Sequence, residues 1–312
     1  MSKPVLLTGL QPSGDLHIGN YFGALKPFTE TYEKYESFLM VADYHALTSL
    51  KDPEKLRVGI VNVVKDYLAA GVDPEKAVIF KQSEVPAHTE LAWIFDCLVT
   101  VPFLMQAHAY KDKVAKGLEA NAGLFTYPML MAADILLYDA EVVPVGEDQR
   151  QHIEYAREAA GKFNHAYGEV FKAPKEVILK GLGVVPGTDG TKMSKSYGNT
   201  IPLFGSRDDL SKAVMSIVTD SSGDRPENVY AIHKVIKSES ELELLYEEKK
   251  GKYKELKEAL VEDLDTFIAP MRETRAAISD EEVQRVLAAG AAKAREISEK
   301  KMQQVRKAIG VA

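Results

Sequence analysis

The chain has 312 residues, of which 46% are hydrophobic and 27% charged, a balance that is typical of folded globular proteins and excludes disordered and collagen-like ones. Its net charge of −7 at pH 7 excludes binding of nucleic acid through bulk charge, so any such contact needs a local basic patch. The single cysteine, Cys97, excludes an internal disulfide, a multi-cysteine zinc site and a cysteine-ligated iron–sulfur cluster.

The N-terminal residues give no sign of export. Residues 1–14 lack the basic start and the long apolar run of a signal peptide, and the most apolar region of the chain is interrupted by Asp134 and Asp139. We therefore expect a cytoplasmic protein without a membrane-spanning segment, and the single cysteine is consistent with a reducing compartment.

Strand-like and helix-like segments alternate along residues 1–205. Short apolar runs at 4–8, 38–42 and 78–80 are typical of buried strands, and helix-like segments follow them at 17–32, after Asp52-Pro53 and after Pro86. This alternation predicts an α/β fold with a parallel sheet covered by helices. Ligands in such sheets bind beyond the carboxyl ends of the strands, so we search the loops there first.

From residue 206 to the end the pattern is helical throughout. Leu256 and Leu260 recur at helical spacing, and Ser279 with Glu282 three residues later predicts the start of the last helix. This helix carries a basic stretch, 285–307, which contains Arg285, Lys293, Arg295, Lys300, Lys301, Arg306 and Lys307 beside only Glu296 and Glu299. The stretch is either a source of phosphate contacts or a packing helix with solvated lysines, and the residues alone favour neither.

Glycines bound the loop after the first expected strand. Gly9 and Gly14 are spaced as in a phosphate loop, but Asp15 stands where a Walker sequence has lysine, which disfavours a P-loop NTPase. The next segment, His17-Ile-Gly-Asn20, begins a helix, where free N–H groups can face a phosphate and the glycine lets a nucleotide approach the backbone. An ordinary glycine turn before a histidine is the alternative.

A second glycine-rich loop spans residues 186–199 and contains Lys192 and Lys195. Such a loop can close over a polyphosphate, where ammonium groups would stabilise the charge that develops on a leaving pyrophosphate. A solvated basic loop is the alternative, and the loop by itself favours neither.

Together, the two loops resemble the paired signature of the class I aminoacyl-tRNA synthetases, with His17-Ile-Gly-Asn20 as the first half and Lys192-Met-Ser-Lys-Ser196 as the second. The pair is far more specific than either half. The resemblance implies a Rossmann-like fold in which the first motif binds ATP and the lysine loop stabilises transfer of AMP to an amino acid. Asn20 stands where the family often has a second histidine, and it retains the capacity for hydrogen bonding.

The segment 125–138 bears on which amino acid is activated. On a helix, Tyr127, Met131 and Asp134 share one face. A carboxylate among apolar neighbours needs a donor, and an indole N–H is a donor that accepts nothing. A core helix with Asp134 bonded to backbone or to an arginine is the alternative for an isolated acidic residue. The segment resembles the tryptophan-binding helix of bacterial tryptophanyl-tRNA synthetases, and this favours the first interpretation.

The same resemblance implies roles for residues elsewhere in the chain. The strand-like segment 140–145 and the residues 146–152 resemble the part of the family that lies at the ribose of ATP and at the polar end of the amino acid. Asp43-Tyr-His45 and Lys111–Lys116 resemble two further segments, for which a structural histidine and a surface charge run are the alternatives. The implied catalytic residues are His17, Asn20, Lys192 and Lys195. The implied ATP-binding residues are Gln11, Pro12, Ser13, Gly19, Asn20, Lys113, Gly146, Glu147, Asp148, Val184, Lys192, Met193, Ser194, Lys195 and Ser196, and the implied tryptophan-binding residues are Leu7, His45, Tyr127, Met131, Asp134, Val143, Val145 and Gln149.

The resemblance implies a tryptophan–tRNA ligase, which forms tryptophanyl-adenylate from L-tryptophan and ATP with Mg²⁺ and then charges the tRNA for tryptophan. We expect neither zinc nor an iron–sulfur cluster. It also implies a Rossmann-like catalytic domain at 1–205, with a dimer-forming insertion at about 85–120 that holds Trp93, a homodimer, and an all-helical anticodon-binding domain at 206–312. One alternative is a tyrosine–tRNA ligase, which would need groups for a phenolic hydroxyl. The other is a non-charging paralogue that binds tryptophan or ATP as a regulatory module.

Overall fold

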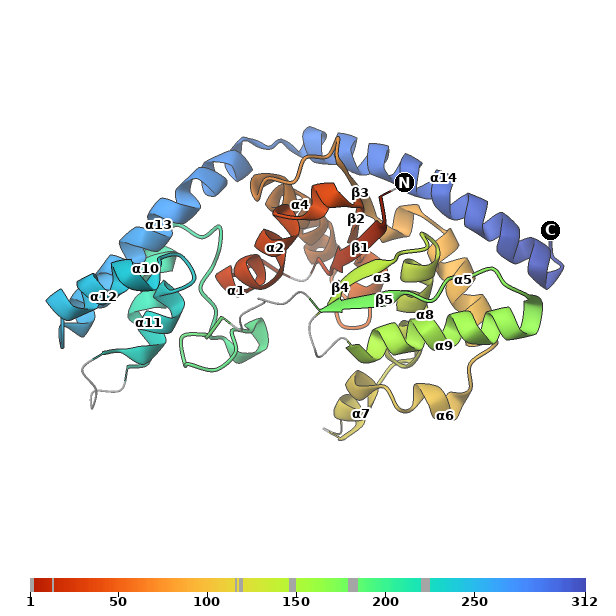
Figure 1. Ribbon diagram of the computed structural model, residues 1–312, viewed down its shortest axis with the longest axis horizontal. Helices are drawn as coiled ribbons and strands as arrows, with labels where there is room; N and C mark the ends of the chain where they lie inside the picture. The colour runs from red at the N-terminus through yellow and green to blue at the C-terminus, as the bar shows by residue number, and fades with distance from the viewer. Residues whose placement is uncertain are drawn as a thin grey trace.

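The chain forms a central sheet domain with a helical arm at one end (Figure 1). The computed structural model describes residues 3–12, 14–115, 117, 120–145, 150–178, 185–219 and 225–312. Helices α13 and α14 make an arch that runs from the arm across the top of the sheet in this view (Figure 1). None of the helices within the described residues combines the length and the apolar character that a membrane span needs.

Five parallel strands form the sheet, in the order β3-β2-β1-β4-β5. Their bounds are β1 Val5–Leu10, β2 Glu36–Val41, β3 Ala77–Lys81, β4 Val142–Val145 and β5 Lys175–Ile178. The register of β1 on β2 runs from Val5 opposite Glu36 to Leu10 opposite Val41. The predicted parallel sheet is therefore confirmed, with the ends of the first three strands slightly shifted from their predicted places.

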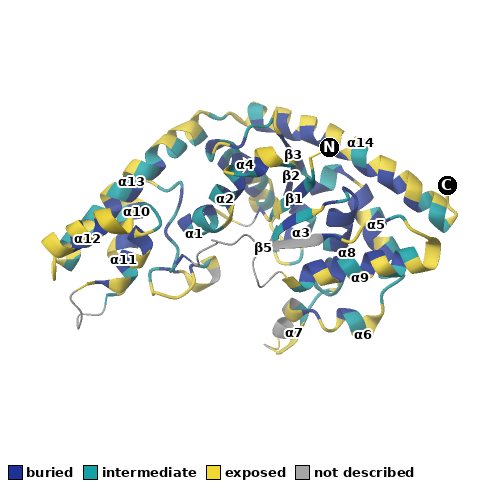
Figure 2. Cartoon of the chain, viewed as in Figure 1, coloured by how far each residue is buried: buried dark blue, intermediate teal, exposed yellow. Residues whose placement is uncertain are grey.

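Alternate strand residues belong to two apolar clusters, one on each face of the sheet. Phe38 and Met40 of β2 belong to the cluster covered by α5 (Ala87–Asp96), α8 (Ala122–Leu136) and α9 (Arg150–Tyr167). Leu39 and Val41 belong to the other cluster, which α4 (Pro53–Ala69) covers. Figure 2 shows buried residues on the sides of these helices that face the sheet. The layers are helix, sheet and helix, as the Rossmann-like expectation requires.

Shorter helices connect these elements. Their bounds are α1 Ile18–Asn20, a π-helical turn Tyr21–Leu25, α2 Lys26–Thr29, α3 Asp43–Ala46, α6 Val101–Leu104 and α7 His108–Ala115. The helices after residue 205 are α10 Arg207–Met215, α11 Glu227–His233, α12 Glu239–Glu248, α13 Tyr253–Ala277 and α14 Asp280–Ile309. The described residues of this second part are thus helical, as predicted.

Two helix starts that the sequence indicates are confirmed by their caps. The side chain of Asp52 accepts hydrogen bonds from the N–H groups of Glu54 and Lys55 at the start of α4. The side chain of Ser279 accepts one from the N–H of Glu282 at the start of α14. In both cases a short polar side chain binds backbone donors that have no partner within the helix, so the helix begins where the sequence predicts.

Helix α14 crosses the free edge of the sheet at β3. Val283 and Leu287 in its first half pack into the cluster under α4, whereas Met302 in its second half packs into the cluster under α5, α8 and α9. At the crossing, Gly290 lies on the backbone of β3, because a Cβ there would stand 1.9 Å from the carbonyl oxygen of Ile79. Glycine alone permits this approach.

Ion pairs attach the second half of α14 to the sheet domain. The ammonium of the buried Lys301 lies 2.7 Å from Oδ1 of Asp139, and the guanidinium of Arg306 binds both carboxylate oxygens of Glu90 on α5 at 2.7 Å. These two cations of the basic stretch 285–307 therefore serve packing. The predicted division into a catalytic domain at 1–205 and an anticodon-binding domain at 206–312 stays a prediction about function. It does not describe the packing, because α14 packs against the sheet domain.

Candidate functional site

The candidate site lies at the carboxyl ends of the strands, where the strand order reverses between β1 and β4. After β1 ends at Leu10, the chain enters the loop that leads to His17, and β2 ends at Val41 shortly before His45. β4 ends at Val145, directly before the segment 146–149. The topology thus brings to one end of the sheet the ends of three strands that precede, in sequence, segments with predicted site residues.

His17 and Asn20 cap α1 reciprocally. Nδ1 of His17 accepts a hydrogen bond from the backbone N–H of Asn20 (3.3 Å), and Oδ1 of Asn20 accepts one from the backbone N–H of His17 (3.2 Å). Burial, together with the nearby ammonium of Lys195, lowers the pKa of His17 to about 4. The ring is therefore neutral at pH 7, and because Nδ1 accepts, the proton sits on Nε2. That N–H and the amide nitrogen of Asn20 are donors suited to an anion.

The first loop is joined to the segment that follows the lysine loop. Two backbone hydrogen bonds of 3.0 Å connect residues 16–18 with residues 201–203. Gly19 is needed at this junction, because a Cβ there would stand 2.9 Å from Nδ1 of His17 and 3.2 Å from Cβ of Met193. The two halves of the predicted signature are therefore in contact, although more than 170 residues separate them along the chain.

The ammonium of Lys195 lies over the first loop, 3.6 Å from where a Cβ of Gly14 would be. Loss of hydration lowers the pKa of Lys195, while the carboxylates of Asp15 and Asp66 oppose this effect. Gly14 and Asp15 also line a cleft of about 450 Å³ between this loop and α4. Lys192 is exposed, and its role at a phosphate stays a prediction.

The buried side chain of Asn199 organises the lysine loop. Its Nδ2 donates to Oδ1 of Asp189 (2.8 Å) and to the carbonyl oxygen of Lys192 (3.1 Å), and its Oδ1 accepts from the N–H of Ser194 (2.8 Å). Gly187 makes room for it, since a Cβ there would stand 2.3 Å from Nδ2 of Asn199. One amide thus holds the backbone on both sides of residue 193.

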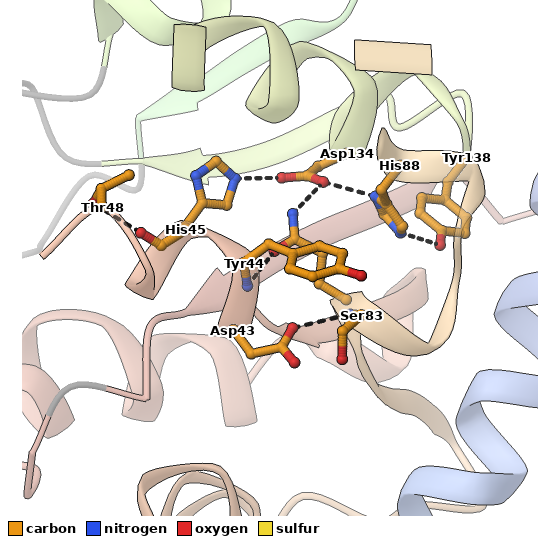
Figure 3. Close-up of polar contacts among 9 residues, drawn as sticks. Asp43, Tyr44, His45, Thr48, Ser83, His88, Asp134 and Tyr138 are labelled. Carbon is orange, nitrogen blue, oxygen red and sulfur yellow. Dashed lines mark hydrogen bonds and ion pairs between the residues drawn. The ribbon is translucent and has the colours of Figure 1, made fainter. Parts of the chain in front are cut away.

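Asp134 on α8 is 2% exposed, and its carboxylate is surrounded by nitrogen donors (Figure 3). Oδ1 accepts from Nε2 of Gln82 and from Nδ1 of His88, and Oδ2 accepts from Nε2 of His45, each at 2.7 Å. Burial by itself would raise the pKa of Asp134, but His45 and His88 outweigh it and lower the pKa to about 2. Asp134 is therefore an ionised acceptor. Its described partners are histidine and glutamine side chains rather than backbone or an arginine, and its contact with a substrate stays a prediction.

Other predicted tryptophan-binding residues that the structure describes lie near Asp134 or on the same face of the sheet. The ring of Tyr127 lies 6.3 Å from that of His45, and its hydroxyl contacts Nε2 of His152. Burial, with a smaller effect of Tyr155, raises the pKa of Tyr127 to about 12, so the hydroxyl keeps its proton. Leu7, Val143 and the partly buried Met131 belong to the apolar cluster of this face.

Several predicted residues lie outside the described part of the structure. They are Ser13, Gly146, Glu147, Asp148, Gln149 and Val184, together with the side chains of Lys113, Val145 and Ser196. Gln11 is exposed, whereas Pro12 is buried against α4, where a Cβ at Gly59 would stand 2.4 Å from its carbonyl oxygen. Within the ranges that are described, three or more His, Cys, Asp or Glu side chains nowhere gather as they would around a metal ion.

The sequence analysis missed Gln82 and His88, and it did not assign a role to Asn199. Gln82 and His88 follow the carboxyl end of β3, and ligand contacts in parallel sheets commonly come from such places. This position in the sequence could have marked them as candidate site residues. Oε1 of Gln82 accepts from the N–H of Tyr44 (3.2 Å), which orients the amide so that its nitrogen faces Asp134.

Comparisons with known proteins bear on this site. The family model described as tRNA synthetases class I (W and Y) matches residues 2–285. The tryptophan–tRNA ligase of Fusobacterium nucleatum is 46% identical over 316 residues, which cover 98% of this chain and 97% of that protein. That of Campylobacter jejuni is 45% identical over 317 residues, which cover 98% of this chain and 99% of that protein. The crystal structure of tryptophanyl-tRNA synthetase from Campylobacter jejuni, complexed with ADP and tryptophan, has a TM-score of 0.92 at 45% identity and covers 98% of this chain and 99% of that chain.

Proposed function

The chain belongs to the class I tRNA synthetases of the tryptophan and tyrosine family, and from this premise we propose how its residues activate L-tryptophan with ATP and charge tRNA. The amino acid is tryptophan rather than tyrosine, because the relatives at 46% and 45% identity over 98% of the chain are tryptophan–tRNA ligases. The observation that carries the assignment of residues is the contact between the two signature loops. It sets the neutral His17 and the ammonium of Lys195 at one end of the sheet.

Activation of tryptophan needs no side-chain nucleophile. The carboxylate of tryptophan attacks the α-phosphorus of ATP, an oxygen–phosphorus bond forms, and the bond to the leaving pyrophosphate breaks. The protein therefore acts by positioning the reactants and by stabilising charge. ATP is expected as its magnesium complex, with the ion held by the phosphates. In the second step a terminal ribose hydroxyl of the tRNA attacks the carbonyl carbon, and AMP leaves.

We assign the phosphates of ATP to the junction of the two loops. The Nε2–H of His17 and the amide of Asn20 donate to phosphate oxygens, and Lys195 with Lys192 balances the charge on the leaving pyrophosphate. Residues 11–13, 146–148, 184 and 193–196, with Lys113, complete the proposed ATP site.

We assign the indole N–H of tryptophan to Asp134. Among the described contacts Oδ2 has one donor, His45, so it has capacity for a second. An ionised carboxylate accepts and cannot donate, which matches an N–H that donates and cannot accept. Tyr127 and Gln149 would hold the α-amino group. Leu7, Met131, Val143 and Val145 would supply apolar contact for the ring.

The test is exchange of labelled pyrophosphate into ATP, run with tryptophan and with tyrosine. We expect exchange with tryptophan alone, and we expect the variant Asp134→Asn, which keeps the size of the side chain but not its charge, to lose most of it. Exchange with tyrosine would move the assignment to that amino acid. Exchange without tRNA charging would favour a regulatory paralogue, and equal exchange by Asp134→Asn would remove the proposed contact.

We further propose that the protein is a homodimer. Exposed apolar side chains occur on α5 and at both ends of α6, where Trp93 is 70%, Val101 60% and Met105 50% exposed. Oδ1 of Asp96, at the end of α5, is buried without a described partner, and burial raises the pKa of this carboxyl to about 6. Sedimentation should give a dimeric mass at micromolar concentration, and Trp93→Asp should shift it to a monomer. A monomeric mass for the unmodified protein would contradict the proposal.

We propose that the helical arm contacts the anticodon of the tRNA, and that the exposed cations of α14 add phosphate contacts. These cations are Arg285, Lys293, Arg295, Lys300 and Lys307. Because charging of tRNA supplies translation, we expect the protein to act in the cytoplasm.

A further inference from the structure

We propose that His88 and Tyr138 position the carboxylate of Asp134 for the indole N–H of tryptophan, and that His88 is therefore a specificity-determining residue of the amino-acid site. The inference rests on the proposed contact between Asp134 and the substrate. It adds two residues, His88 and Tyr138, on the Oδ1 side of the carboxylate, whereas the indole N–H is proposed to bind Oδ2.

His88 bridges two residues that are one helical turn apart (Figure 3). Its Nδ1 lies 2.7 Å from Oδ1 of Asp134, and its Nε2 lies 2.9 Å from the hydroxyl of Tyr138. The ionised Asp134 can only accept, so Nδ1–H of His88 donates to it. Nε2 of His88 shares the second hydrogen bond with the hydroxyl of Tyr138.

Packing holds both rings in place. His88 is 0% exposed and stacks on Phe80, with centroids 6.0 Å apart and an interplanar angle of 24°. Tyr138 stacks on Phe38, with centroids 4.9 Å apart and an angle of 29°. Burial raises the pKa of Tyr138, so its hydroxyl keeps its proton beside His88. Neither ring can turn without disturbing the apolar cluster of this face.

The bridge determines which carboxylate oxygen faces a ligand. Gln82 and His88 together occupy Oδ1, whereas Oδ2 has only the contact with His45 among those described. Loss of the His88 contact frees Oδ1, so the carboxylate can rotate away from its ligand and loses one of its charge-stabilising donors. The resulting loss should appear only with an amino acid that carries an N–H on its ring.

The experiment compares two amino acids in pyrophosphate exchange. One is tryptophan, and the other is 3-(benzothiophen-3-yl)alanine, in which sulfur replaces the indole N–H and the ring keeps its shape. We expect His88→Leu to raise KM for tryptophan about tenfold, as the weakening of a charge-assisted hydrogen bond predicts, with KM for the sulfur analogue changed less than about twofold. His88→Asn, whose amide nitrogen can replace Nδ1–H, should restore most of the affinity for tryptophan.

A matched control exists in the helical arm. His233 is also 0% exposed, and its ring nitrogens contact Oδ2 of Asp263 at 2.8 Å and the hydroxyl of Tyr246 at 3.3 Å. His233→Leu removes the same kind of bridge far from the proposed tryptophan site. We expect it to lower Tm while the ratio of the two KM values stays that of the unmodified protein.

The outcomes distinguish the proposed contact of Asp134 with the indole N–H from the proposed positioning role of His88. If the unmodified protein does not discriminate between tryptophan and the sulfur analogue, the contact of Asp134 with the N–H fails whatever the variants do. If it discriminates but His88→Leu raises both KM values equally, or raises neither, the positioning role is overturned. Should His88→Leu fail to fold, Tyr138→Phe decides in its place. We expect it to raise KM for tryptophan about threefold and to spare the analogue, and an equal effect on both would overturn the role.

Discussion

The chemistry of single residues at this site depends on protonation states that their neighbours determine. His17 is neutral and presents its proton on Nε2, Asp134 is ionised with a pKa lowered to about 2, and Tyr127 keeps its proton with a pKa raised to about 12. Each group is thus prepared either to donate or to accept before a substrate arrives. Preorganised groups of this kind need little rearrangement during the reaction.

The lowered pKa of His17 predicts a dependence of stability on pH. Between its folded value of about 4 and its ordinary value of 6.5, the unfolded chain binds a proton that the folded chain does not. The free energy of unfolding therefore rises with pH across this window, and stability is lost as the pH falls from 6.5 towards 4.

Urea unfolding at pH 7.5 and at pH 5 measures this loss. The variant His17→Asn keeps a capping oxygen but does not titrate, so it should lose about 2 kcal/mol less than the unmodified protein. Equal losses in the two proteins would contradict the assignment.

Which side chains lie at the candidate site was partly predictable from the sequence, but which atoms make their contacts was not. His17, Lys195 and Asp134 follow from motif and residue type, whereas the tautomer of His17 follows from its cap on Asn20. His88 lies 46 residues from Asp134 along the chain, and only the fold places them in contact. Sequence spacing carries no information about such a distance.

At the scale of elements, the lysine loop behaves as a unit because one buried amide connects its parts. Asn199→Ala removes the donors to Asp189 and Lys192 and the acceptor for Ser194. We expect kcat for adenylate formation to fall at least about tenfold, since removal of a preorganised stabilising group costs roughly 1.4 kcal/mol or more. KM for tryptophan should stay within about twofold, because Asp134 lies on another element, α8. Single-turnover formation of the adenylate measures the change, and an unchanged rate would contradict it.

Two glycine substitutions, one where α14 crosses β3 and one on α9, should have opposite effects on stability. Gly290→Ala places a Cβ 1.9 Å from the carbonyl oxygen of Ile79, so we expect a loss of about 3 kcal/mol or more in the free energy of unfolding. Gly161→Ala on the exposed face of α9 meets nothing within 4 Å and should stabilise the protein by about 0.5 to 1 kcal/mol through helix propensity. Urea denaturation compares the two. A Gly290→Ala protein as stable as the unmodified one would contradict the close approach.

Elements with explicit capping residues were predicted at the right places, as Asp52 and Ser279 show. Strands β1 to β4 were predicted from apolar runs, whereas β5 and the order of the strands were not. Gly290 gave no signal, because a glycine inside a helical pattern looks like a weak position rather than a contact point. Its meaning depends on a strand more than 200 residues earlier in the chain.

On the scale of the whole molecule, α5 connects three parts of the protein. His88 near its start contacts the carboxylate of the amino-acid site, Glu90 binds Arg306 of α14, and Trp93 is exposed on the proposed dimer face. The geometry of the proposed amino-acid site therefore depends on α5, which also carries the proposed interface and is held by an ion pair to α14.

The exposed cations of α14 predict a separation between the two steps of the reaction. Lys293→Glu combined with Lys307→Glu should raise KM for tRNA about tenfold, because contacts with phosphate are lost, and should leave pyrophosphate exchange unchanged. Lys34→Glu, an exposed charge reversal on the sheet domain, serves as the control. An equal loss in both steps would indicate damage to folding rather than to tRNA binding. The sequence could not separate these lysines from Lys301 and Arg306, which packing occupies.

The passage of α14 along β3 also bears on how the protein is made. β3 is an edge strand, and the helix that covers it comes from the end of the chain, more than 200 residues after Ile79. At about 5 to 20 residues per second, a ribosome needs roughly 10 to 40 s to deliver that cover. During this interval the nascent sheet presents an unpaired strand to its surroundings, which is the kind of surface that templates aggregation. Chains that stop short of α14 should therefore associate edge to edge and depend on chaperones, even though they contain the whole of the sheet.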